Sequence, residues 1–123
     1  MKRRIYIIVV VGFGVAVWLG VPLQLHAGGD PTKGRSVYEK YCLLCHGPQG
    51  RGDGPQGQLL KPPATNFRNP ESKAKTDDVL LKAIREGHPK TAMTEWKREL
   101  SEENMTNVLA YIRGLSGGPE KGF

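Results

Sequence analysis

Two cysteines and a histidine lie within five consecutive residues, Cys42-Leu43-Leu44-Cys45-His46. In a Cys-x-x-Cys-His sequence the two thiols can add across the vinyl groups of a haem, and the histidine beside the second thiol is held where its ring nitrogen can ligate the iron. Cys42 and Cys45 are the only cysteines of the chain, so this attachment would use both. The pentapeptide therefore predicts one covalently bound haem c, attached through Cys42 and Cys45 and ligated by His46.

A Cys-x-x-Cys pair also occurs in thioredoxin-like redox sites and as half of a zinc site. A thioredoxin-like site requires a βαβ pattern, but a helix-like segment precedes this pair and no strand alternation does. A zinc site needs two more ligands, and His26 and His88 are far along the chain from the motif. Haem attachment is the preferred interpretation, and a dithiol oxidoreductase with free Cys42 and Cys45 is the alternative.

The first 27 of the 123 residues have the features of a secretory signal peptide. Basic residues and a long apolar run are followed by Leu25-His26-Ala27, which fits cleavage after Ala27. The alternative is an uncleaved membrane anchor, because the apolar run approaches the roughly 20 residues that a spanning helix needs. Both interpretations predict that residues 28–123 lie in the periplasm.

Composition limits the remaining function classes. The chain has 18 basic and 12 acidic residues, and three of the basic ones belong to the leader, so the rest is only mildly basic. No nucleic-acid-binding motif accompanies that charge. A glycine-rich segment over residues 47–57 lacks the Gly-Lys-Ser/Thr ending of a phosphate loop, which argues against nucleotide binding. Residues 28–123 suit one small domain, in which a covalent haem would supply much of the core.

The elements that position the motif are predicted to be helices. Three segments have apolar residues at helical spacing, and each follows a residue that favours the N-cap position. The expected helices are 31–46 after Asp30, 77–86 after Thr76, and 102–116 after Ser101. The long loops between them are uncommon in so small a domain unless they surround a cofactor.

With these elements in place, the chain resembles the class I c-type cytochromes over nearly all of residues 28–123. It is similar to the small bacterial monohaem cytochromes and to single-haem domains attached to respiratory complexes. The matching elements are Gly34 and Tyr38 before the Cys-x-x-Cys-His motif, Gly54-Pro55 after it, Met93 in a loop, and Val108-Leu109-Ala110-Tyr111 in the last helix. The resemblance implies an all-α cytochrome c fold, with three to four helices around one covalent haem c. It also implies that Gly34 and Tyr38 meet Val108 and Tyr111 where the first and last helices cross.

The resemblance further implies the axial ligands of the iron. His46 is the proximal ligand, and its other ring nitrogen is expected to donate to the backbone carbonyl of Pro55. Met93 is the expected opposite ligand, and its soft thioether would raise the reduction potential. His88 is the alternative, which would give bis-histidine ligation and a lower potential. The family often has proline after this methionine, whereas Thr94 follows it here.

These ligands predict an electron-transfer protein and not an enzyme, because a six-coordinate iron has no open site for a substrate. The iron would cycle between Fe(III) and Fe(II), exchanging electrons with redox proteins through small, transient interfaces. The protein would act as a free carrier or as a subunit of a respiratory complex. The alternative is a gas-binding or gas-sensing haem module, in which Met93 is absent from the iron or easily displaced.

Overall fold

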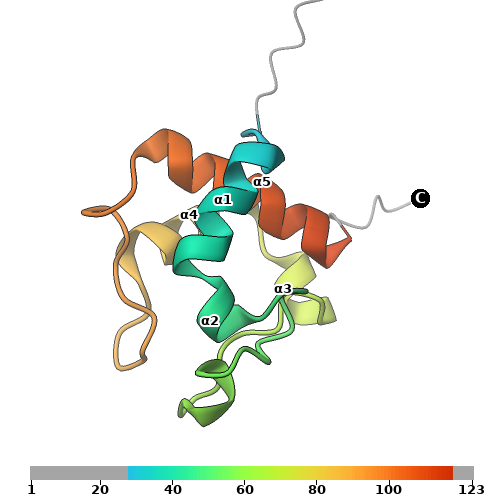
Figure 1. Cartoon of the computed structure of the whole chain (residues 1–123), viewed down its shortest axis with the longest axis vertical. Helices are drawn as coiled ribbons and strands as arrows, with labels where there is room; N and C mark the ends of the chain where they lie inside the picture. Colours follow the sequence, from blue (N-terminus) through green and yellow to red (C-terminus); the bar gives the residue numbers. More distant parts are fainter. Residues whose placement is uncertain (1–27, 118–123) are drawn as a thin grey trace, which may run out of the picture.

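The computed structural model describes residues 28–117, and within this range the chain forms helices and no strands (Figure 1). The elements are α1 (Pro31–Tyr41), α2 (Leu43–His46), the 3₁₀-helix η1 (Gly57–Leu59), α3 (Pro70–Ala74), α4 (Asp77–Glu86) and α5 (Glu102–Ser116). The predicted all-α fold is therefore confirmed. The predicted leader, residues 1–27, lies outside the described residues. Between residues 28 and 117, none of the helices combines the length and the apolar character needed to cross a membrane.

The three predicted N-caps are confirmed. The carboxylate of Asp30 accepts hydrogen bonds from the backbone of α1, the hydroxyl of Thr76 caps α4, and the hydroxyl of Ser101 caps α5. The predicted helix over 31–46 is divided at Cys42, where the N–H of Cys45 donates to the Cys42 carbonyl and forms a tight turn. The rest of the Cys-x-x-Cys-His motif after Cys42 therefore forms a separate short helix, α2.

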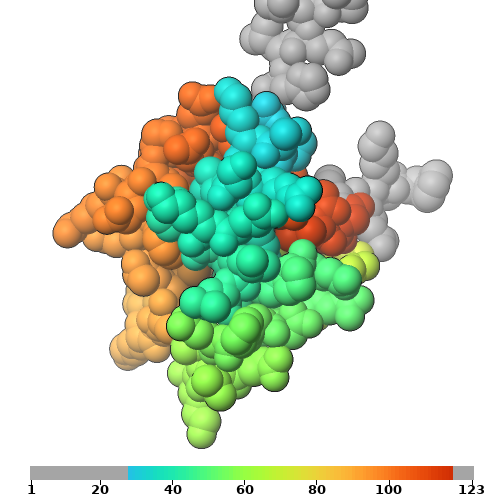
Figure 2. All heavy atoms as spheres, viewed as in Figure 1, coloured from blue at the N-terminus to red at the C-terminus, as the bar shows by residue number. Residues whose placement is uncertain are grey.

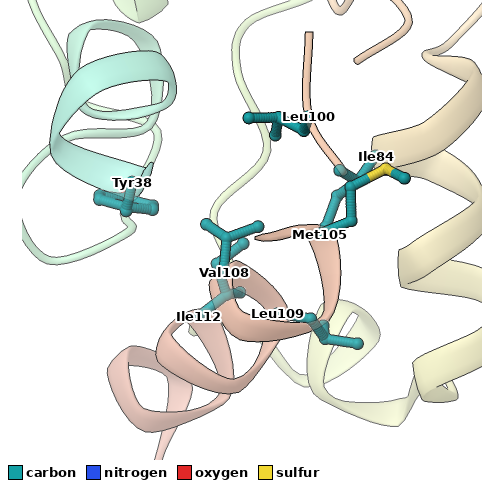
Figure 3. Packing of buried hydrophobic residues seen from close by; sticks show 7 residues of the cluster. All are labelled: Tyr38, Ile84, Leu100, Met105, Val108, Leu109 and Ile112. Atoms are coloured by element: carbon teal, nitrogen blue, oxygen red, sulfur yellow. The ribbon is translucent and has the colours of Figure 1, made fainter. Parts of the chain in front are cut away.

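Helix α1 crosses α5 at Gly34, as the resemblance implied. A Cβ atom at Gly34 would overlap the backbone carbonyl of Asn107, so the two backbones approach more closely than any larger residue allows. One turn later, the ring centroids of Tyr38 and Tyr111 lie 5.2 Å apart in a tilted arrangement. Val108 is fully buried at the same crossing (Figure 3). This contact fixes α1, and through it the haem motif, to the C-terminal helix.

The hydrophobic core extends from α1 across α5 to α4. Figure 3 shows Met105 of α5 beside Ile84 of α4, with Leu100 above them and Tyr38 on the far side of Val108. Leu100 and Met105, which stand on either side of the Ser101 N-cap at the positions of a hydrophobic staple, are both buried. The core therefore joins α1, α4 and α5. Several of its residues, among them Ile84 and Leu109, also line a cavity.

An arginine on α5 fixes the chain between α3 and α4. The guanidinium of Arg113 pairs with the carboxylate of Asp77 at 2.7 Å and donates to the backbone carbonyls of Lys73 and Lys75. Its side chain is only 14% exposed. Neither α3 nor this clamp was predicted from the sequence.

Candidate haem site

A cavity of about 370 Å³ lies between the helices and the long loops. Its lining includes Cys42, Cys45 and His46 of the motif together with Met93 and His88 of the loop after α4. Most of the other lining groups are apolar; they include Leu60, Pro62, Pro63, Phe67, Leu80, Ile84, Trp96, Leu100, Leu109 and Ile112. The structure therefore brings together four of the five predicted site residues, Cys42, Cys45, His46 and Met93, which are separated by up to about half of the domain's length.

Two segments outside the long helices line this cavity: the chain around η1 and the loop after α4. The space-filling view shows the segment around η1 at the lower end of the molecule and the loop that follows α4 along the left side, with α2 between them (Figure 2). Cys45, His46 and Met93 are partly exposed, consistent with a site that reaches the surface.

The Cys-x-x-Cys-His motif is held by α1 and by the glycine-rich loop. The hydroxyl of Tyr38 donates to the carbonyl of Gly47 at 2.6 Å, which ties the end of α2 back to α1. On the other side, a Cβ at Gly57 would overlap the carbonyl of Cys45, so η1 lies directly against the motif. The two sides fix the orientation of α2 and therefore of Cys45 and His46, which lie on it.

The surroundings of His46 favour a neutral imidazole. Its Nδ1 lies 3.2 Å from the carbonyl oxygen of Thr65, and its ring stacks on Phe67 with centroids 4.5 Å apart. Burial lowers the pKa of His46, and this outweighs the opposing effect of the Thr65 carbonyl. Because a carbonyl only accepts hydrogen bonds, Nδ1 carries the proton, and the lone pair of Nε2 is available to a metal.

The backbone partner of His46 differs from the one expected. The predicted acceptor was the carbonyl of Pro55, but the structure pairs Nδ1 of His46 with Thr65 instead, and Pro55 is exposed. After the motif, the chain runs through the glycine-rich loop and then returns to the cavity wall at Pro62 and Pro63. The carbonyl of Thr65, two residues later, therefore lies beside His46. The two prolines favour an extended segment, but they do not indicate which carbonyl of that segment reaches His46.

The loop that carries Met93 is fixed by its own hydrogen bonds. The N–H of His88 donates to the Met93 carbonyl at 3.0 Å, and the N–H of Met93 donates to the Thr91 hydroxyl at 3.2 Å. Between them lies a turn closed by a bond from the Thr91 N–H to the His88 carbonyl, with Lys90 at φ 62°. Met93 is half-buried in the cavity wall, whereas His88 is exposed at its margin.

The environment of the thiols disfavours dithiol redox chemistry. Burial, with a smaller effect from Cys45, raises the pKa of the Cys42 thiol to about 12. Catalytic dithiols instead depend on a thiol whose pKa is lowered, because the thiolate is the nucleophile. Cys42 is therefore not the activated thiol that the alternative interpretation requires.

The residues present fit haem c. The thiols of Cys42 and Cys45 could form the two thioether bonds, and Nε2 of His46 could bind the iron. Met93 lines the same cavity. The cavity is within the range of about 300–1,000 Å³ typical of ligand sites, and its wall is largely apolar.

Comparison with known proteins identifies the family. Residues 29–112 match the family described as cytochrome c oxidase, cbb3-type, subunit III. The chain belongs to this family of c-type cytochrome domains. The class I cytochrome c resemblance is thereby confirmed, and with it the covalently bound haem c that such domains carry.

Relatives of this cytochrome domain support the same conclusion. Cytochrome c-554(547) of Halothiobacillus neapolitanus is 33% identical over 89 residues, which cover 71% of this chain and 98% of that protein. A chain of the Kuenenia stuttgartiensis reducing HAO-like protein complex Kustc0457/Kustc0458 is 30% identical with a TM-score of 0.62. That match covers 70% of this chain and 42% of the chain from the complex. The KustC0563 c-type cytochrome is 28% identical with a TM-score of 0.58, covering 67% of this chain and 95% of that one.

Proposed function

We propose that the protein is an electron carrier whose single haem c has His46 and Met93 as axial ligands. The observation that carries this proposal is that the motif and Met93 line one apolar cavity. Haem c supplies a one-electron Fe(III)/Fe(II) couple when bound, and a methionine thioether opposite histidine raises its potential. The related proteins, which include a c-type cytochrome matched over 95% of its own length, support electron transfer as the general role.

The chain contributes orientation and exclusion of water. The Thr65 carbonyl fixes the imidazole of His46 in the tautomer that presents Nε2 to the cavity. The turn before Met93 holds the backbone of Met93 through two hydrogen bonds, even though Thr94 stands where the family often has proline. With His46 and Met93 as the two ligands of the iron, no position at the iron would remain for a substrate. The protein is therefore a carrier and not an enzyme.

We propose that residues 1–27 direct export to the periplasm and are cleaved after Ala27. There the domain would exchange electrons with other redox proteins by transient docking, as a free carrier or as a subunit of a respiratory complex. One similar chain comes from a multi-protein complex, which supports the second arrangement. The N-terminal residue of the exported protein, read by mass spectrometry, tests the cleavage: Gly28 is expected.

The test of the function is a redox titration of the purified protein combined with exposure to carbon monoxide. A reversible one-electron transition, with a reduced spectrum that the gas leaves unchanged, is expected for a carrier with both axial positions filled. A spectrum that changes with carbon monoxide would favour a gas-binding module. A denatured protein whose mass lacks the haem would overturn both.

A further inference from the structure

The described lining of the haem cavity includes a lysine but no acidic residue. Among the described residues of the lining, Lys75 carries the single ammonium group, and none is an aspartate or a glutamate. The histidines of the lining, His46 and His88, belong to the motif and to the methionine loop. A haem carries two propionate carboxylates, and a carboxylate near an apolar cavity requires a countercharge or hydrogen-bond donors. Lys75 is the residue of the cavity wall that can supply the countercharge.

The backbone of Lys75 is fixed while its ammonium group is weakly engaged. Its N–H donates to the carbonyl of Ser72 at 3.3 Å, and its carbonyl accepts from the guanidinium of Arg113 at 2.6 Å. The side chain is 37% exposed, and its nearest carboxylate, that of Glu71, lies 4.0 Å away on a side chain that is 85% exposed. Exposed pairs of this kind contribute little, so the ammonium group is available to a better partner.

A second polar group lies beside it. Ser72 is one helical turn before Lys75, lines the same cavity and is only 5% exposed. Its N–H donates to the side-chain oxygen of Asn69 at 2.7 Å, which fixes the backbone of Ser72 beside the cavity. A serine hydroxyl can donate a hydrogen bond to a carboxylate within reach. Together, Ser72 and Lys75 form a polar corner at the junction of α3 and α4.

We propose that Lys75 and Ser72 bind one propionate of the haem, and that Lys75 thereby raises the reduction potential. An unpaired carboxylate near the iron favours the ferric state by Coulomb attraction, and an ammonium group beside it cancels that effect. Arg113 acts as a positioning residue, because it holds the carbonyl of Lys75 in place. The proposal depends on haem c in this cavity and not on which side chain lies opposite His46.

The test is the reduction potential of the Lys75→Met variant of the haem-loaded protein. We expect the ferrous-to-ferric ratio at a fixed applied potential to fall about tenfold, which for a one-electron couple corresponds to about 59 mV. Lys75→Gln should show the same fall, and Lys75→Arg should keep the potential because it keeps the charge. The low-spin visible spectrum should be unchanged in all three, which separates loss of the charge from loss of an axial ligand.

Lys82→Met is the matched control. Lys82 also lies 4.0 Å from a glutamate four residues away, Glu86, and its removal changes the net charge equally. Its side chain is 72% exposed and it is not part of the cavity wall, so its potential should stay at the wild-type value. An equal fall for Lys82→Met, an unchanged potential for Lys75→Met and Lys75→Gln, or an equal fall for Lys75→Arg would overturn the proposal.

Discussion

The crossing of α1 and α5 gives a prediction in which one substitution has opposite effects at two glycines. Gly34 and Gly114 both lie inside helices, and in each case alanine should add about 0.8–1 kcal/mol of helix propensity. A Cβ at Gly114 has no atom within 4 Å, whereas a Cβ at Gly34 overlaps the carbonyl of Asn107 and lies 3.0 Å from the backbone nitrogen of Val108.

The clash at Gly34 cannot be relieved by rotating a side chain, because backbone atoms of α5 cause it. Helices α1 and α5 would have to separate, which also loosens the contact between Tyr38 and Tyr111. Overpacking of this kind costs about 1–3 kcal/mol. After subtraction of the gain in helix propensity, Gly34→Ala should lower the free energy of unfolding by up to about 2 kcal/mol. Gly114→Ala should raise it by about 0.5–1 kcal/mol.

Thermal unfolding of the haem-loaded protein, followed by far-ultraviolet circular dichroism, measures both effects. For a domain of this size, 1 kcal/mol corresponds to a shift in Tm of about 4–8 °C. Gly34→Ala should therefore unfold at a lower temperature than the wild type, and Gly114→Ala at a slightly higher one. A Gly34→Ala variant as stable as Gly114→Ala would refute the close crossing of the two helices.

Three further predictions concern residues in or beside the loops around the cavity. Arg113→Met should lower the free energy of unfolding, measured by urea titration, by about 1.5–3 kcal/mol, since it removes charge-assisted hydrogen bonds of a mostly buried side chain. The control Arg35→Met breaks an exposed ion pair with Glu39 and should change the free energy of unfolding by less than about 0.5 kcal/mol; equal effects of the two substitutions would contradict the clamp. Lys90→Gly should raise stability by about 0.5–1 kcal/mol, because a non-glycine residue in the left-handed region costs about 1–2 kcal/mol; a loss of stability in the same titration would mean that the turn has another conformation. His88→Ala should leave the visible spectrum unchanged, and disappearance of the low-spin spectrum would instead make His88 the axial ligand.

Local signals in the sequence predicted the helices that carry the site. Asp30, Thr76 and Ser101 act as caps through hydrogen bonds to residues two or three positions away, so each can be recognised from a few neighbouring residues. The close crossing at Gly34 was also predictable, but only through resemblance to a family in which the same elements occur in order.

The contacts that depend on the path of a long loop could not be predicted. Thr65 and Pro55 are both separated from His46 by glycine-rich chain, and nothing local decides which carbonyl returns to the imidazole. The partners of Arg113 lie 36 to 40 residues away, so its role appears only when α3 and α5 are placed together. The polar corner at Lys75 likewise exists only in the folded chain.

The most direct test of the account is the visible spectrum of the oxidised protein beside that of Met93→Ala. The account predicts that the wild type has a low-spin c-type spectrum with a weak long-wavelength band from sulfur-to-iron charge transfer. Met93→Ala should lose that band, become high-spin, bind carbon monoxide when reduced and have a lower potential. A wild-type protein without the band, or a Met93→Ala variant whose spectrum is the same as the wild type's, would contradict ligation by His46 and Met93.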